Sequence, residues 1–61
     1  MTFRIVPEEA REEYIEVETI WRGAIVVIKE PDGASKTYLK KNELLTLAAA
    51  LEQAARSLKD D

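Results

Sequence analysis

A run of four β-branched apolar residues, Ile25 to Ile28, constrains the fold of this chain more than any other feature. β-Branched side chains favour strands, and a strand in a small sheet usually alternates apolar and polar residues because only one of its faces is buried. This run is apolar on both faces, which indicates a central strand. Both faces of the surrounding sheet therefore need a cover, and a single helix can cover only one of them.

Other segments with period-two alternation complete a predicted antiparallel meander of three to four strands. The residues from Tyr14 to Trp21 alternate cleanly, and those from Thr2 to Val6 do so weakly. Arg22-Gly23 and Pro31-Asp32-Gly33 predict tight turns in which the glycines take positive φ angles. The predicted strands span about residues 2–6, 14–21, 24–30 and 34–40.

The last third of the chain predicts one amphipathic helix over about residues 43–58. Asn42 is suited to be its N-cap, and Glu43 to be near its positive end. One arc of the helix is apolar and is expected to pack on one face of the sheet; its members are Leu44, Leu47, Leu51, Ala54, Ala55 and Leu58. Leu45 falls outside this arc. The predicted fold is therefore a single α+β domain over residues 1–61.

Composition excludes several classes of function. The 61-residue chain has no Cys and no His, so it predicts no disulfide, no thiolate or imidazole metal site and no cofactor. Its serines and threonines have no histidine to activate them, and so small a chain builds no sizeable desolvated pocket alone. We therefore predict that the protein is not an enzyme. A domain this small often needs a further support, and self-association is the one this composition supplies most easily.

Charge and hydropathy bear on partners and location. The chain carries 12 acidic and 9 basic residues, for a net charge of −3. That balance disfavours binding to nucleic acid, which depends on neutralising phosphates. No apolar run approaches 18 residues and the first residues do not resemble a signal peptide, so we expect no membrane association and a cytoplasmic location.

A second apolar set is predicted on the sheet face away from the helix. It comprises Ile20, two residues of the central strand, Tyr38 and, as a further candidate, Tyr14. A soluble monomer rarely leaves such a set in water. The covers considered are the N-terminal strand with Phe3 and Ile5, a second copy of the chain or a different protein. The remaining interpretation is a twisted sheet whose ends curl over the set.

Two charged groups are candidate sites. The acidic residues Glu8, Glu9, Glu12, Glu13, Glu16 and Glu18 are interpreted mainly as a solvated face; docking on a basic partner is the alternative, and weak cation binding a remote one. Lys36, Tyr38, Lys40 and Lys41 could stack a base and follow a phosphate backbone, but edge-strand lysines that deter aggregation are the favoured interpretation. Trp21 is expected to cap one end of the sheet, with an exposed binding residue as the alternative.

The segment D-G-A-S-K-T-Y-L followed by K-N-E-L-L-T-L-A-A-A-L-E-Q-A-A resembles small uncharacterised proteins of actinobacteria and their phages. In those proteins a strand after an Asp-Gly turn runs into an Ala/Leu-rich helix. The resemblance covers about residues 31–55 and implies a bacterial or phage accessory protein that binds a host factor. A designed mini-protein is another possibility, although the Arg22-Gly23 turn and Leu45 are not idealised.

These observations predict a protein-binding module that modulates another protein as a homodimer, formed through a sheet face or an edge strand. The expected apolar contacts are Ile20, Trp21, Tyr38 and Leu45, and the expected steering charges are Glu12, Glu13, Glu16 and Glu18. A nucleic-acid-binding protein that uses Lys36, Tyr38 and Lys40 and a structural subunit of a larger assembly are the alternatives.

Overall fold

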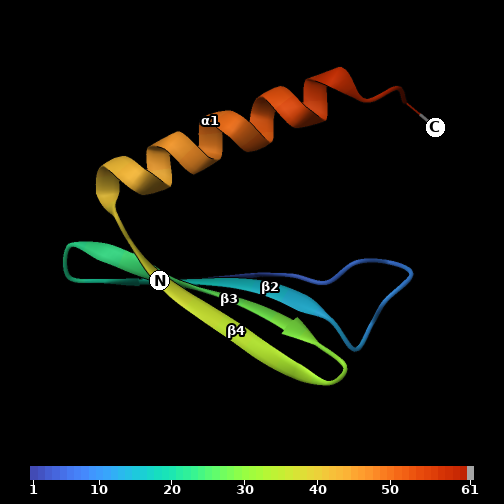
Figure 1. Cartoon of the computed structure of the whole chain (residues 1–61), viewed down its shortest axis with the longest axis horizontal. Coiled ribbons are helices and arrows are strands. Elements are labelled where there is room, and N and C mark those ends of the chain that lie inside the picture. Colours follow the sequence, from blue (N-terminus) through green and yellow to red (C-terminus); the bar gives the residue numbers. More distant parts are fainter. Residues whose placement is uncertain (61) are drawn as a thin grey trace.

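The computed structural model describes residues 1–60 and confirms the predicted α+β meander. Four antiparallel strands form one sheet in the order β1-β2-β3-β4, and one helix follows them (Figure 1). The elements are β1 (Thr2–Ile5), β2 (Tyr14–Ile20), β3 (Gly23–Glu30), β4 (Gly33–Lys40) and α1 (Lys41–Ser57). β1 lies at the sheet edge beside β2, so it extends the sheet and does not fold over either face.

The register of the strands sorts their side chains into two faces. Val26 of β3 lies between Val17 and Thr37, so these three side chains share one face. We call this face the apolar face, because the register places only one charged strand residue on it, Glu30 at the end of β3. Its uncharged side chains are those of Phe3, Ile5, Ile15, Val17, Thr19, Ala24, Val26, Ile28, Ser35, Thr37 and Leu39.

The opposite face, called here the mixed face, gathers the second apolar set that the sequence predicted. Ile25 lies between Glu18 and Tyr38, and Val27 lies between Glu16 and Lys36. Its apolar and aromatic members are Tyr14, Ile20, Ile25, Val27 and Tyr38. Long charged side chains stand among them and half-bury Ile25 and Val27, since such chains cover apolar surface with their aliphatic stems.

The first hairpin turn is shifted by one residue from its predicted position and the second is one residue shorter than predicted. The prediction of positive φ at the glycines is wrong. No described residue has a positive φ. Gly23 and Gly33 are the first residues of β3 and β4, where they pair with Ile20 and Glu30 respectively. The turns therefore consist of Trp21-Arg22 and Pro31-Asp32, and the negative φ of proline suits the first central position of such a turn.

The helix begins two residues earlier than predicted, and its N-cap is Lys40, not Asn42. The reason is a hydrogen bond between the backbone of Lys40 and a side chain in the first turn of the helix. The Lys40 backbone N–H donates to Oε1 of Glu43 over 2.9 Å, which is one half of a capping box. The Asn42 carbonyl instead accepts a hydrogen bond from Thr46 Oγ1 at 3.0 Å.

The helix covers much less of the sheet than the sequence pattern suggested. α1 starts beside the sheet, contacts β3 and β4, and then diverges from it (Figure 1). Exposure rises along its apolar arc, from 37% at Leu47 to 60% at Leu51 and 73% at Leu58. No residue of α1 is buried. Among the described hydrophobic residues only Ala24 and Val26 are buried, on the apolar face.

The divergence has a local cause in the connection between β4 and α1. Lys40 ends the strand and Lys41 begins the helix, so no loop residue separates them. Strand-to-helix connections usually contain about 2–6 residues, which let the helix turn back onto its sheet. Without such a loop the helix leaves at the angle set by the backbone of Lys40, and its apolar arc separates from the apolar face.

Candidate protein-binding site

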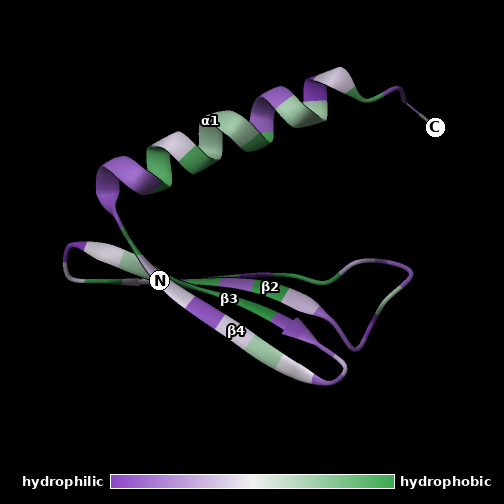
Figure 2. Ribbon diagram, viewed as in Figure 1, coloured by the Kyte–Doolittle hydropathy of each residue, from purple (hydrophilic) through white to green (hydrophobic). Residues whose placement is uncertain are grey.

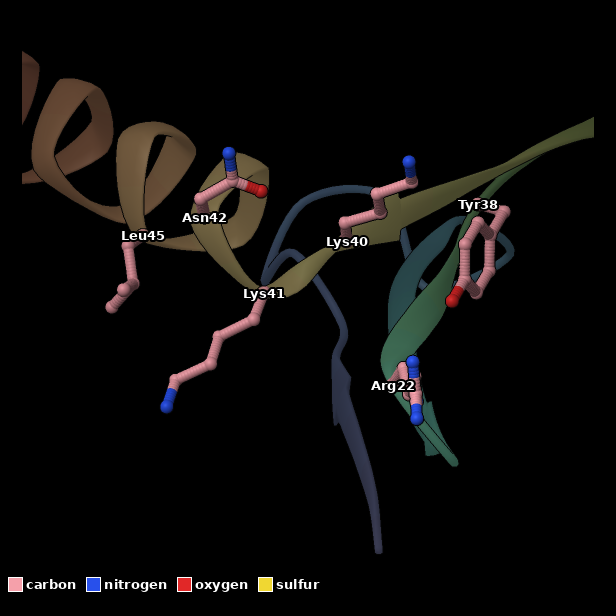
Figure 3. Close-up of a pocket in the computed structure, with 6 residues that line it drawn as sticks. All are labelled: Arg22, Tyr38, Lys40, Lys41, Asn42 and Leu45. Atoms are coloured by element: carbon pink, nitrogen blue, oxygen red, sulfur yellow. The ribbon is translucent and has the colours of Figure 1, made fainter.

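Two shallow pockets lie side by side at the end of the molecule where the β2–β3 turn meets the junction of β4 and α1. They share Arg22 and Lys41. The larger has a volume of about 490 Å³ and is shown in Figure 3; its lining is Arg22, Tyr38, Lys40, Lys41, Asn42 and Leu45. The smaller measures about 240 Å³ and is lined by Ile20, Trp21, Arg22, Gly23, Lys41 and Leu44.

The structure thus brings together the four apolar contacts expected from the sequence, Ile20, Trp21, Tyr38 and Leu45. Three basic residues stand among them. We call this region the aromatic end; it consists of Ile20, Trp21, Arg22, Tyr38, Lys40, Lys41 and Leu45.

Trp21 is the most exposed aromatic side chain described, at 90%, so the expectation that it caps the sheet as core is wrong. The reason is its position in the two-residue turn, beyond the last paired row of Ile20 and Gly23. The guanidinium carbon of Arg22 lies 4.8 Å from the centroid of its ring. A cation over an indole is attracted to the ring face, so Arg22 helps to orient a side chain that no core packing holds.

Tyr38 is held by close packing at a glycine. A Cβ atom on Gly23 would lie 2.8 Å from the Tyr38 hydroxyl oxygen and would overlap the Leu39 carbonyl oxygen. The ring therefore occupies space that any other residue at position 23 would need. Its 46% exposure leaves one part of the ring to the larger pocket (Figure 3).

The acidic residues expected to steer a partner are not gathered at this end. Glu12 and Glu13 line a different pocket, of about 500 Å³, together with residues 8–11 and Pro31. Pro31 lies in the β3–β4 turn, at the far end of β3 from Trp21. Glu18 lies on the mixed face, and Ile25 separates it from Tyr38 in the same row.

Glu16 is engaged with β1. Nε and Nη2 of Arg4 donate to its Oε1 over 2.9 and 2.7 Å, and the Arg4 guanidinium carbon lies 4.1 Å from the centroid of the Tyr14 ring. The hydrogen bond to Glu16 raises the pKa of Arg4 above its ordinary value. Glu16 therefore joins β1 to β2 and is less available to an incoming partner.

The chain is consequently polarised along its sheet. The aromatic end carries Arg22, Lys40 and Lys41, whereas the segment from Glu8 to Glu13 gathers carboxylates near the opposite end. Arg22 was not predicted as a site residue; its position in a turn next to Trp21 is the signal that could have identified it. Lys36, from the nucleic-acid alternative, lies on the mixed face with Tyr38 and Lys40.

Within residues 1–60 no three Asp or Glu side chains gather in an arrangement that could hold a metal ion. The same part of the chain buries no side-chain nitrogen or oxygen without a hydrogen-bond partner. Its helix is too short and too polar to cross a membrane. What the aromatic end can supply is an apolar and aromatic contact surface with a cationic rim.

No protein-family model matches the chain, and comparison with curated proteins and with solved structures finds no significant match.

Proposed function

We propose that this chain is a non-enzymatic protein-binding module that modulates another protein through the aromatic end. The observation that carries the proposal is the 90% exposure of Trp21 in the smaller pocket, beside the larger pocket that Tyr38 and Leu45 line. Tryptophan, tyrosine and arginine are the residues most enriched among those that dominate binding energy at protein interfaces. The absence of His and Cys from the chain supports binding rather than catalysis.

The basic rim selects the chemistry of the partner. Arg22, Lys40 and Lys41 would be complementary to carboxylates flanking an apolar side chain that enters the larger pocket. The proposed partner is thus a protein segment that carries an apolar anchor beside Asp or Glu. The resemblance over residues 31–55 favours a bacterial or phage accessory protein, acting in the cytoplasm, as the setting.

Selection of random displayed peptides on the immobilised protein tests this proposal. We expect enrichment of sequences with an aromatic or aliphatic residue flanked by acidic ones. Each enriched peptide should lose more than tenfold in affinity on Trp21→Ala and on Leu45→Glu, because loss of a dominant contact costs about 2 kcal/mol or more. Glu9→Gln, at the opposite end, is the matched control and should leave affinity unchanged. Enrichment of peptides without acidic residues would contradict the proposal, as would peptides whose affinity is lowered by neither Trp21→Ala nor Leu45→Glu.

Binding of single-stranded nucleic acid is the second candidate, favoured by the placement of Tyr38 among Arg22, Lys40 and Lys41. Aromatic rings among cations stack bases and neutralise phosphates. A titration of oligo(dT) monitored by the fluorescence of Trp21 distinguishes the two functions. Affinity that falls linearly with salt on a logarithmic plot would support this candidate; no binding to oligo(dT) at low salt would exclude it.

A further inference from the structure

Two apolar surfaces of this chain lie open to solvent and fail to meet each other. One is the apolar face of the sheet, where Phe3, Ile5, Ile15 and Ile28 are between 42% and 66% exposed. The other is the apolar arc of α1, where Leu51 and Leu58 are 60% and 73% exposed. Figure 2 shows the apolar residues running along β2, β3 and α1, with the helix set apart from the sheet.

The exposed area is too large for a compact monomer. A folded monomer of 6.9 kDa is expected to expose about 4,000 Å², whereas this chain exposes 5688 Å². Its radius of gyration is 12.9 Å, against about 10.5 Å for a compact domain of this length. The excess is therefore about 1,700 Å² per chain. A monomer with only two buried hydrophobic side chains among its described residues would not offset the conformational entropy that folding costs.

We propose that a second copy of the chain covers these surfaces, with the apolar arc of α1 from each copy lying on the apolar face of the other. Covering the excess in both copies would bury about 3,400 Å², which lies within the range of roughly 2,000–5,000 Å² found in obligate homodimers. One two-fold axis makes both contacts at once, because each copy supplies one helix and one sheet.

The dimensions and charges of the two surfaces agree. A helix of 17 residues is about 26 Å long and strands of 8 residues are about 27 Å long, so α1 can lie along β3 and β4 of the other copy. The arc of Leu44, Leu47, Leu51, Ala54, Ala55 and Leu58 contains no charged residue. The one charged strand residue on the apolar face is Glu30, which is exposed at the end of β3, where it can stay in water. The contact would therefore leave no charge buried without a partner.

The junction between Lys40 and Lys41 favours exchange of the helix between copies. With no loop residue between strand and helix, α1 cannot turn back fully onto its own sheet. Short connections of this kind favour the exchange of an element between protomers, since the contact is then made without bending the junction.

Oligomeric state with a matched pair of substitutions tests the proposal. Leu51 and Leu45 are equally exposed, at 60% and 61%, but only Leu51 lies on the apolar arc. Light scattering behind size exclusion should give the wild type and Leu45→Glu a mass of about twice 6.9 kDa. Leu51→Glu should give a monomer, or an unfolded chain by circular dichroism. A folded monomeric wild type, or a Leu51→Glu variant that remains dimeric, would overturn the proposal.

A second measurement locates the contact and does not depend on whether Leu51→Glu folds. The chain has no Cys, so Leu51→Cys and Ile15→Cys chains can be mixed, refolded together and treated with a bifunctional thiol reagent. We expect cross-links between the helix of one chain and the sheet of the other. Leu45→Cys mixed with Ile15→Cys should give few. Equal yields in both mixtures, or links only between two Leu51→Cys chains, would overturn the exchanged arrangement.

Leu45 reports on partner binding and Leu51 on dimerisation, so the two proposals can fail separately.

Discussion

The Tyr38 side chain fills the space where Gly23 would carry a Cβ atom, and that atom would lie 2.8 Å from the Tyr38 hydroxyl oxygen and 2.9 Å from Cζ. Tyr38 lines the larger pocket of the aromatic end, while Gly23 lines the smaller one. The placement of one site residue is therefore decided by the absence of a side chain on the neighbouring strand.

Gly23→Ala should destabilise the fold by about 1–3 kcal/mol, because the added methyl group overlaps both the Tyr38 ring and the Leu39 carbonyl. Gly33→Ala is the matched control at the start of the next strand, where nothing lies within 4 Å of the added atom and φ is not positive. It should be neutral or stabilising by up to about 1 kcal/mol. Urea denaturation at a fixed protein concentration measures both, and equal costs would contradict the packing at Gly23.

Trp21 should behave as a solvated indole in the folded protein. It is the one tryptophan of the chain, so its fluorescence reports directly on this position. We expect acrylamide to quench it nearly as well as it quenches free tryptophan amide, and Trp21→Phe to change the free energy of unfolding by less than about 0.5 kcal/mol. Emission shifted to the blue and shielded from acrylamide without any added partner would show that the side chain is covered, against the 90% exposure found here.

Glu16→Gln should lower the midpoint temperature of unfolding, because it weakens the link from β1 to β2 through Arg4. The loss should shrink as sodium chloride is raised, since the Arg4 side chain is 53% exposed and salt screens the pair. The pKa of Arg4 is raised by this bond, so the charge on Arg4 persists at every pH below the ordinary pKa of arginine. Glu18→Gln is the control, because Glu18 forms no ion pair among the described residues. An equal fall in its midpoint temperature would argue against a stabilising Arg4–Glu16 pair.

Glu43→Ala should reduce the helix content measured by circular dichroism and destabilise the fold by about 0.5–1 kcal/mol. The change removes the acceptor for the Lys40 N–H and a favourable negative charge in the first turn. Glu43→Gln should restore part of the loss, since it keeps an oxygen acceptor. Glu52→Ala, in an exposed i,i+4 pair with Arg56 at 3.6 Å, should cost less. Similar losses for Glu43→Ala and Glu52→Ala would contradict the assignment of the cap.

The sequence by itself predicted an antiparallel meander of three to four strands and the alternation of side chains along each, but it left open whether the N-terminal strand joins the sheet. Period-two alternation is a local property, and the tight turns at Trp21-Arg22 and Pro31-Asp32 set the register once the strands pair. The pattern alone placed Ile20 and Tyr38 on one face with two residues of the central strand, which the register identifies as Ile25 and Val27. The observed ends of the elements differ from the predicted ones by one or two residues. Gly23 and Gly33 begin strands although they were predicted to lie in turns, and Lys41 begins the helix although it was predicted to precede the cap.

Only the tertiary structure decided how far α1 lies from the sheet and what meets at the aromatic end. The helical pattern indicates an apolar arc, but it contains no information on the angle at which Lys40 passes the chain to Lys41. Likewise Arg22 lines one pocket with Tyr38 and Leu45, which are distant from it in the sequence. Periodicity reports which side of an element is apolar. The exit angle of a helix and the meeting of distant residues depend on the whole backbone. The sequence pattern therefore cannot say what covers that apolar side.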